Sequence, residues 1–185
     1  VYSQPVKIFF GAGKFAGLHD VLSELGLHRC VVVCGRHFAP KAEELVSSMD
    51  ELCTVFGGVE QNPQLSGVEE TVKLAREHGA DAIIGIGGGS AIDTAKFAAA
   101  ITLDGGDAIE YYRGARPFPA KRLPVVAVPT TAGTGSEVTQ VSVISHSTEK
   151  KTINNPAFMP LAAIVDPELC MSVPPRTTMN TGLDA

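Results

Sequence analysis

The chain has 185 residues, a net charge of −5 and a pI of about 5.5, with 44% hydrophobic and 19% charged residues. This composition is typical of an ordered globular domain with a real core, and the basic residues do not cluster, which argues against a nucleic-acid partner. No apolar run approaches the roughly 20 residues of a membrane span, and the N-terminal residues lack a signal-peptide pattern. We therefore expect a cytoplasmic protein with no membrane partner.

The first half of the chain alternates short apolar runs with segments of helical spacing. We expect strands at 6–10, 29–34 and 52–56, each followed by a helix, at 15–25, 39–49 and 66–78. Ser66 and Glu69 have the spacing of a capping box, and Gly79 is typical of a helix end. A further strand begins at 82, and an alanine-rich helix with Ser90 as its expected N-cap runs to about 101.

This alternation predicts an α/β fold: a Rossmann-like parallel sheet with helices on both faces. Residues 104–123 are expected to form a long irregular connection, and 125–128 and 162–165 two more buried strands. A β-hairpin would pair 138–145 with 151–154 through a turn near Ser147. The segment 174–185 begins like a helix with proline at its start, so we expect the chain to be a fragment whose last residues open a following domain.

The glycine turn at the end of the 82–87 strand is the first candidate site. Gly87, Gly88 and Gly89 lead from this strand into Ser90 and a helix. A strand, a glycine turn and a helix N-terminus form an anion site, because backbone N–H groups and the helix dipole face the ligand. The pattern therefore favours binding of nucleotide phosphates at Gly87–Ser90, and the alternative is a tight turn without a ligand.

The turn departs from the G-x-G-x-x-G fingerprint, since Ser90 occupies the last glycine position and no acidic residue follows at the ribose-binding distance. A ribose partner could come instead from the end of the 29–34 strand, where Gly35, Arg36 and His37 follow. Gly35 offers no carboxylate for two ribose hydroxyls, and arginine suits a 2′-phosphate by charge and geometry. The sequence thus favours NADP over NAD, with a surface Arg and His as the alternative.

Residues 129–137, Pro-Thr-Thr-Ala-Gly-Thr-Gly-Ser-Glu, follow another buried strand. Their hydroxyl groups and close backbone suit contacts to pyrophosphate and ribose, although a helix N-cap region would have a similar composition. The four cysteines form no C-x-x-C pair, the five histidines show no metal-ligand spacing, and Asp184 alone indicates no site. The residues by themselves therefore predict neither a disulfide framework nor a complete metal site.

Three stretches together resemble the iron-containing (group III) alcohol dehydrogenase family. They are the Gly87-Gly88-Gly89-Ser90-x-x-Asp93-x-x-Lys96 turn, the 129–139 run, and Ile164-Val165-Asp166-Pro167 with the later Thr181-Gly182-Leu183-Asp184-Ala185. The resemblance covers essentially the whole chain. It implies that 1–185 is an NAD(P)-binding α/β domain, that about 174–185 is the start of the metal-binding domain, and that the all-helical C-terminal domain of the family is absent.

The resemblance also assigns roles to individual residues. Gly87–Ser90 would hold the pyrophosphate, Thr130, Thr131 and Thr134 would line the cofactor, and Asp93 would lie in the same cleft. Lys151 resembles the lysine that members place near the nicotinamide, and Asp184 matches the first metal ligand, with histidine ligands expected beyond this chain. The metal would be Fe²⁺, or alternatively Zn²⁺. NAD-preferring members often carry Asp where this chain has Gly35, a departure that favours NADP.

The function that follows is hydride transfer between NAD(P) and a small alcohol, aldehyde or ketone, by a metal-dependent oxidoreductase of which this chain is the cofactor-binding part. The isolated fragment is expected to be inactive. Alternatives within the wider fold group are a maleylacetate reductase, a glycerol or glycerol-1-phosphate dehydrogenase, or a dehydroquinate synthase. An alternative of another class is a non-catalytic nucleotide-binding module. The sequence allows a homo-oligomer without specifying one.

Overall fold

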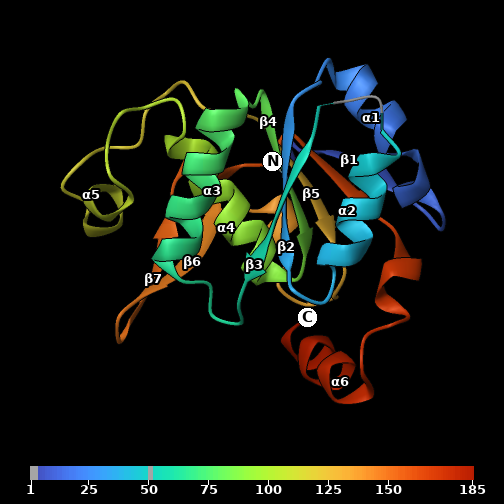
Figure 1. Cartoon of the computed structure of the whole chain (residues 1–185). Coiled ribbons are helices and arrows are strands. Elements are labelled where there is room, and N and C mark those ends of the chain that lie inside the picture. The colour runs from blue at the N-terminus through green and yellow to red at the C-terminus, as the bar shows by residue number, and fades with distance from the viewer. Residues whose placement is uncertain (1–3, 50–51) are drawn as a thin grey trace.

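A computed structural model describes residues 4–49 and 52–185 of the chain (Figure 1). Its strands are β1 (Lys7–Phe10), β2 (Cys30–Gly35), β3 (Thr54–Val59), β4 (Ala82–Gly87), β5 (Val125–Pro129), β6 (Val141–His146), β7 (Glu149–Asn154) and β8 (Ala162–Val165). Its α-helices are α1 (Leu18–Leu25), α2 (Ala39–Ser47), α3 (Leu65–His78), α4 (Gly89–Ile101), α5 (Ala108–Arg113) and α6 (Pro175–Asp184). Short 3₁₀ turns are η1 (Lys14–Gly17), η2 (Ser136–Val138), η3 (Pro156–Phe158) and η4 (Pro167–Cys170).

Six of the strands form one parallel sheet in the order β1-β8-β5-β4-β2-β3, which confirms the predicted Rossmann-like architecture. Side chains along each strand alternate between the two faces. Val31 and Val33 of β2 pack with α3 and α4, whereas Val32 and Cys34 pack with α1 and α2. Figure 1 shows these two helix pairs on opposite sides of the sheet.

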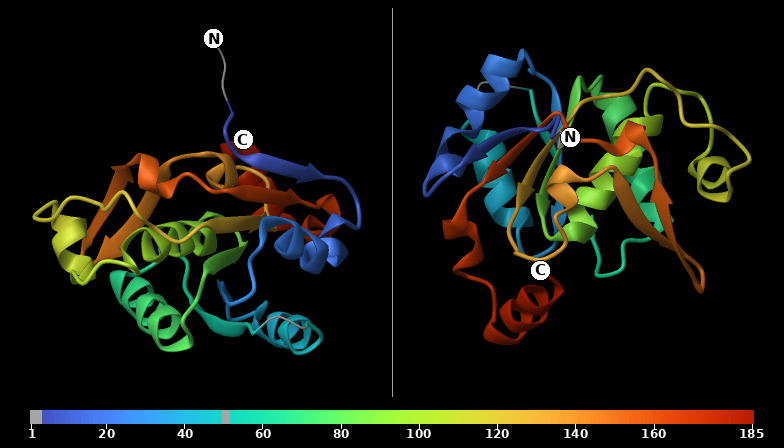
Figure 2. Two further views of the ribbon diagram at one scale, coloured as in Figure 1. Left: turned by 90° about the horizontal axis from the view of Figure 1, so that it is seen from above. Right: turned by 180° about the vertical axis from the view of Figure 1, so that it is seen from behind.

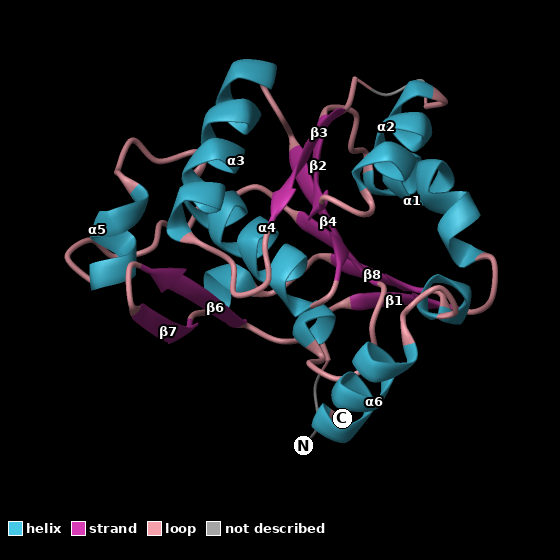
Figure 3. Ribbon diagram, turned by 60° about the horizontal axis from the view of Figure 1, so that its bottom comes forward, coloured by secondary structure: helices cyan, strands magenta, loops and turns pink. Residues whose placement is uncertain are grey.

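The predicted hairpin is present as the antiparallel pair β6–β7, with Ser147 at positive φ in its turn. Figure 2 shows this hairpin beside α4, apart from the edge strand β1. Helix α6 lies beyond the sheet at the end where α4 begins, as Figure 3 shows. The structure thus confirms a helix in the 174–185 segment.

Three predicted details were wrong. Helix α3 begins at Leu65 with an extended Gln64 as its N-cap, so Ser66 lies inside the first turn and forms no capping box. The 104–123 connection, predicted to be irregular, contains α5, whose Asp107 and Glu110 form a capping box. The 15–25 helix is split into η1 and α1, because Gly17 interrupts the regular turn.

Strand β4 and helix α4 lie close together because Gly85 has no side chain. A Cβ at this position would come within 3.0 Å of the Ala95 Cβ and 3.1 Å of the Ile92 Cα. Helix α4 is buried along almost its whole length, between the sheet, α3 and β6. Its N-terminus is thereby fixed at the carboxyl end of the sheet, where ligands bind in open α/β folds.

Candidate functional site: a cofactor cleft at the carboxyl ends of the strands

The predicted glycine turn lies between β4 and α4. Gly87 has a φ of 149°, and a Cβ there would come within 2.9 Å of the Ala91 Cβ, so only glycine fits without strain. Gly88, in extended conformation, is the N-cap of α4, which corrects the prediction that Ser90 has this role. The helix begins two residues earlier than predicted because the turn ends at Gly87, and Ser90 becomes its second residue.

No side chain caps the N-terminus of α4. The Gly88 carbonyl accepts the N–H groups of Ala91 and Ile92, which lie deeper in the helix. The first N–H groups of a helix have no intrahelical partner and favour an anion through charge and geometry. With no side chain at Gly88 or Gly89 in the way, a phosphate group can approach them.

The threonine-rich loop after β5 lies against this turn. A Cβ on Gly88 would be 3.1 Å from Thr131 Oγ1, and a Cβ on Gly89 would be 3.1 Å from Thr134 Oγ1. Thr130 donates its backbone N–H to the Gly87 carbonyl at 2.9 Å. The two stretches that the sequence singled out separately therefore face each other across a narrow gap, with hydroxyl groups on one side and backbone N–H groups on the other.

Two pockets meet at this gap. One, of about 570 Å³, extends from Gly88 and Ser90 to Gly35, Arg36 and His37. The other, of about 560 Å³, extends from the same Gly88 and Ser90 toward Asp93 and Thr134. A dinucleotide has two halves joined by a pyrophosphate, and a cleft with two lobes that share an anion site matches this shape.

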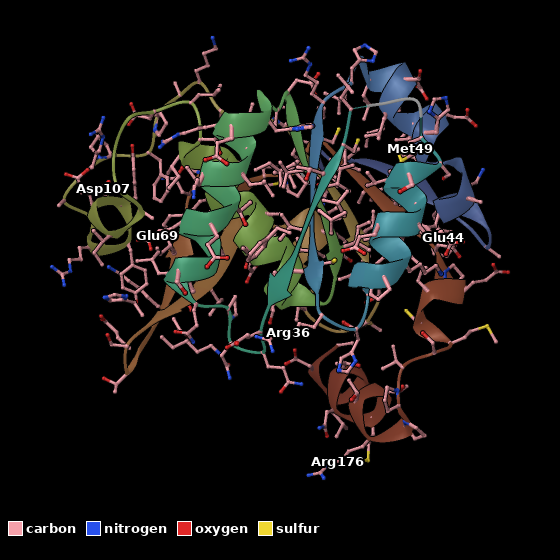
Figure 4. All side chains as sticks on the ribbon, viewed as in Figure 1. Arg36, Glu44, Met49, Glu69, Asp107 and Arg176 are labelled. Atoms are coloured by element: carbon pink, nitrogen blue, oxygen red, sulfur yellow. The ribbon has the colours of Figure 1, made fainter. Side chains whose placement is uncertain are left out.

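The first lobe lies between the ends of β2 and β3. Gly35 has ordinary backbone angles, and a Cβ there would be 3.5 Å from the Val59 carbonyl oxygen, an ordinary contact. Arg36 is exposed, and its Nη2 lies 3.5 Å from Oε1 of Glu60, which also lines this lobe. Figure 4 shows Arg36 beyond the end of the sheet, on the side of α6. The lobe therefore presents one cation and one carboxylate to a ligand.

The second lobe has a buried polar wall made of Asp93, which the family resemblance assigned to the cleft, and of Lys96, to which the sequence analysis assigned no role. Asp93 accepts the Ser136 hydroxyl through Oδ1 at 2.5 Å and the Val143 N–H through Oδ2 at 2.9 Å. Lys96 is fully buried, and its Nζ donates to the carbonyl and hydroxyl oxygens of Ser136, both at 2.9 Å. Asp93 lines the cleft, whereas Lys96 lies behind it.

Burial opposes the charge on both members of this pair. Burial lowers the pKa of Lys96 to about 8, although the nearby Asp93 and Glu137 carboxylates favour the ammonium form. Burial also raises the pKa of Asp93, against the effects of Lys96 and of the hydrogen bonds from Ser136 and Val143. Each group therefore depends on the other to remain charged.

The structure does not bring the predicted catalytic residue, Lys151, to either lobe. Its Nζ donates to the Tyr112 carbonyl at 2.8 Å. Neighbouring residues of a strand point to opposite faces, and it is Lys150 that lines the second lobe, 2.9 Å from Oδ1 of Asn62. Asn62 has a φ of 57°, a conformation that asparagine tolerates better than most residues. From the sequence alone, nothing indicates which of the two adjacent lysines, Lys150 or Lys151, faces the cleft.

Helix α6 closes part of the second lobe. Thr181 lines the lobe, and a Cβ on Gly133 would lie 2.5 Å from the Thr181 carbonyl oxygen. Asp184 is exposed in the last turn of α6. Residues 4–49 and 52–185 contain no group of three or more His, Cys, Asp or Glu side chains that could hold a metal ion. Asp184 alone does not form a metal centre, since catalytic metal sites use about three protein ligands.

The chain belongs to the iron-containing alcohol dehydrogenase family, whose sequence profile matches residues 5–167. Long-chain-alcohol dehydrogenase 1 of Geobacillus thermodenitrificans is 44% identical over 133 residues, which are 71% of this chain and 34% of that protein. The crystal structure of sulfoacetaldehyde reductase from Bifidobacterium kashiwanohense, in complex with NAD⁺, superposes with a TM-score of 0.93 at 39% identity, over 100% of this chain and 50% of that one.

Maleylacetate reductase from Agrobacterium tumefaciens is less similar, with a TM-score of 0.80 at 27% identity over 99% of this chain and 47% of that one. The chain thus spans half or less of the length of these relatives. No helix in the described part of the chain is long and apolar enough to cross a membrane.

Proposed function

We propose that this chain is the dinucleotide-binding part of an oxidoreductase that transfers hydride between NAD(P) and a small alcohol, aldehyde or ketone. The observation that carries the proposal is the cleft of two lobes that meet at the uncapped N-terminus of α4. Membership of the family supports it, as does the NAD⁺ complex of the Bifidobacterium reductase. A non-catalytic nucleotide-binding module would need the same cleft, so catalysis rests on the family.

In this proposal, the described residues bind and orient the cofactor. The N–H groups at Gly88–Ser90 hold the pyrophosphate, Thr130, Thr131 and Thr134 enclose it, and Gly35 to His37 receive the adenosine half. The bound nicotinamide supplies the hydride acceptor or donor. Asp93 and Lys150 border the lobe that would receive the nicotinamide half, and Thr181 of α6 lines the same lobe.

Fluorescence titration of the chain with NADPH and NADH tests this proposal. We expect saturable binding of at least one of them, with energy transfer from the protein's tyrosines and a shift of the nicotinamide emission. Competition by ADP is expected, because ADP would occupy the first lobe and the shared anion site. Absence of saturable binding of both dinucleotides would overturn the proposal.

For the cofactor, we propose a preference for NADP over NAD. Arg36 offers a cation to a 2′-phosphate, and Gly35 offers no carboxylate to a 2′-hydroxyl. Glu60 works against this preference, because its carboxylate pairs with Arg36 in the absence of a ligand. We expect the 2′-phosphate to replace Glu60 as the partner of Arg36.

Gly35→Asp should reverse the preference. A Cβ at this position makes only an ordinary contact and the backbone is unstrained, so the variant should fold. Its carboxylate would accept ribose hydroxyls and repel a 2′-phosphate. A hydrogen bond to a charged group is worth about 1.5–3 kcal/mol, so the ratio of NADH to NADPH affinity should rise by about 10- to 100-fold. Gly35→Asn is the matched control without charge, and an unchanged affinity ratio in Gly35→Asp would contradict the assignment of this lobe to the adenosine ribose.

The two neighbouring lysines provide a second test within the chain. The resemblance assigns the catalytic position to Lys151, whereas the cleft is lined by Lys150. We expect Lys150→Met to weaken NADPH binding by about tenfold through loss of a cation from the lobe, and Lys151→Met to leave it within about twofold of wild type. If Lys151→Met lost more NADPH affinity than Lys150→Met in the same titration, Lys151 and not Lys150 would be the lysine that acts in the site.

For the metal, we propose Fe²⁺ with Asp184 as one ligand and further ligands outside the described residues, and Zn²⁺ as the alternative. A metal ion of this kind acts on the alcohol or carbonyl oxygen as a Lewis acid. A cytoplasmic location and a homo-oligomeric state are also proposals.

A further inference from the structure

Lys96 does not line the cleft, because its side chain is fully buried behind it. It is among the largest fully buried side chains in the described part of the chain. It lies in the middle of α4, between Ala95 and Phe97, which are also fully buried. A methionine has a similar length and would fill this space at a lower desolvation cost. What lysine adds is a set of N–H donors.

These donors all point toward one turn. Nζ lies 2.9 Å from both oxygens of Ser136 and 3.5 Å from Thr139 Oγ1, which places it at the two ends of η2. Two charged groups face Lys96. Asp93, on the same helix, has its Oδ1 3.5 Å from the Lys96 Nζ, and Glu137 belongs to η2. Strand β6 contributes the Val143 N–H, which binds Asp93 and so completes the network.

The held turn continues directly into the cofactor cleft. Ser136 donates its backbone N–H to Thr134 Oγ1 at 3.3 Å. The Thr134 side chain in turn lies against Gly89, where a Cβ would come within 3.0 Å of Thr134 Cγ2. Lys96, Ser136, Thr134 and Gly89 therefore form a continuous series of contacts from the core of α4 to its N-terminus.

We infer that Lys96 is a positioning residue for the nicotinamide half of the cofactor: by holding Ser136 and Thr139, it sets the distance between the threonine loop and the glycine turn. This inference rests on the proposed function. A loop that is already ordered before binding costs less entropy when the ligand arrives, so the contribution of Lys96 appears in affinity. It does not extend to the first lobe, which Lys96 does not contact.

The test compares two ligands in the same variants. The dinucleotide, NADPH or NADH, whichever wild type binds more tightly, needs both lobes and the anion site between them, whereas adenosine needs only the first lobe. We expect Lys96→Met to weaken dinucleotide binding by at least about tenfold and adenosine binding by less than about twofold. Lys73→Met is the matched control, since Lys73 lies exposed on α3 and should leave both affinities unchanged.

Two results would overturn the inference while leaving the proposed function intact. One is wild-type dinucleotide affinity in a folded Lys96→Met, and the other is an equal loss of adenosine and dinucleotide affinity, which would indicate a general structural role. Absence of dinucleotide binding by the wild type would instead overturn the proposed function. If circular dichroism shows that Lys96→Met is unfolded, Ser136→Ala replaces it in the test. This variant removes the hydroxyl that joins Lys96 to Asp93. It should lose dinucleotide affinity while its affinity for adenosine stays near that of wild type.

Discussion

Gly88→Asp is expected to abolish dinucleotide binding by this chain. The backbone of Gly88 is extended, so an L-residue can occupy it, but its Cβ would lie 3.1 Å from Thr131 Oγ1, inside the gap between loop and turn. The carboxylate would then occupy the anion site and repel the pyrophosphate. We expect the affinity for NADPH and NADH to fall by at least about 100-fold, or about 2.7 kcal/mol. Fluorescence titration measures it.

Gly105→Asp is the matched control for this variant. It adds the same charge at a glycine that has no positive φ and whose Cβ would meet nothing within 4 Å. It should bind both dinucleotides with wild-type affinity. If Gly88→Asp also kept wild-type affinity, the glycines would form only a tight turn and the phosphates would lie elsewhere.

The second large effect concerns stability. Asp93→Ala should lower the free energy of unfolding by about 3–5 kcal/mol, because it leaves the fully buried Lys96 ammonium without its carboxylate partner. The double variant Asp93→Ala/Lys96→Met should be more stable than Asp93→Ala alone, since the orphaned charge is then removed as well. Urea denaturation of both variants measures the difference.

Asp20→Ala is a suitable control for the stability experiment. Asp20 is exposed in the first turn of α1, where its favourable interaction with the helix dipole is worth at most about 1 kcal/mol. A loss in Asp93→Ala no larger than in Asp20→Ala would mean that Lys96 does not require a charged partner. A double variant less stable than Asp93→Ala would lead to the same conclusion.

Much of the fold could be predicted from the sequence because its signals are local. The run Cys30–Cys34 is continuously apolar, as expected for a strand buried on both faces, and Gly79 ends α3 in the left-handed conformation. The errors arose where tertiary geometry decides. Ser90 is a good N-cap by type, but the turn at Gly87 makes Gly88 the N-cap, two residues before Ser90.

For the candidate site, the two loops could be predicted from the sequence, but the roles of individual lysines could not. The two glycine- and threonine-rich stretches could be paired because both follow buried parallel strands, whose carboxyl ends lie at one edge. Lys96 could not be interpreted from the sequence alone, since its importance lies in burial and in the Ser136 contact, 40 residues away in the chain. The choice between Lys150 and Lys151 depended on the pleat of β7, which a one-residue shift in the hairpin register would invert.

The contact between Gly133 and α6 has a thermodynamic consequence. Gly133 of the threonine loop lies so close to the Thr181 carbonyl of α6 that neither backbone can move closer without displacing the other. Any change in the position of α6 would therefore alter the lobe proposed for the nicotinamide. Linkage is reciprocal, so a ligand that orders the loop must favour one placement of α6 by the same free energy. Cofactor occupancy and the orientation of this helix would then form a single coupled equilibrium.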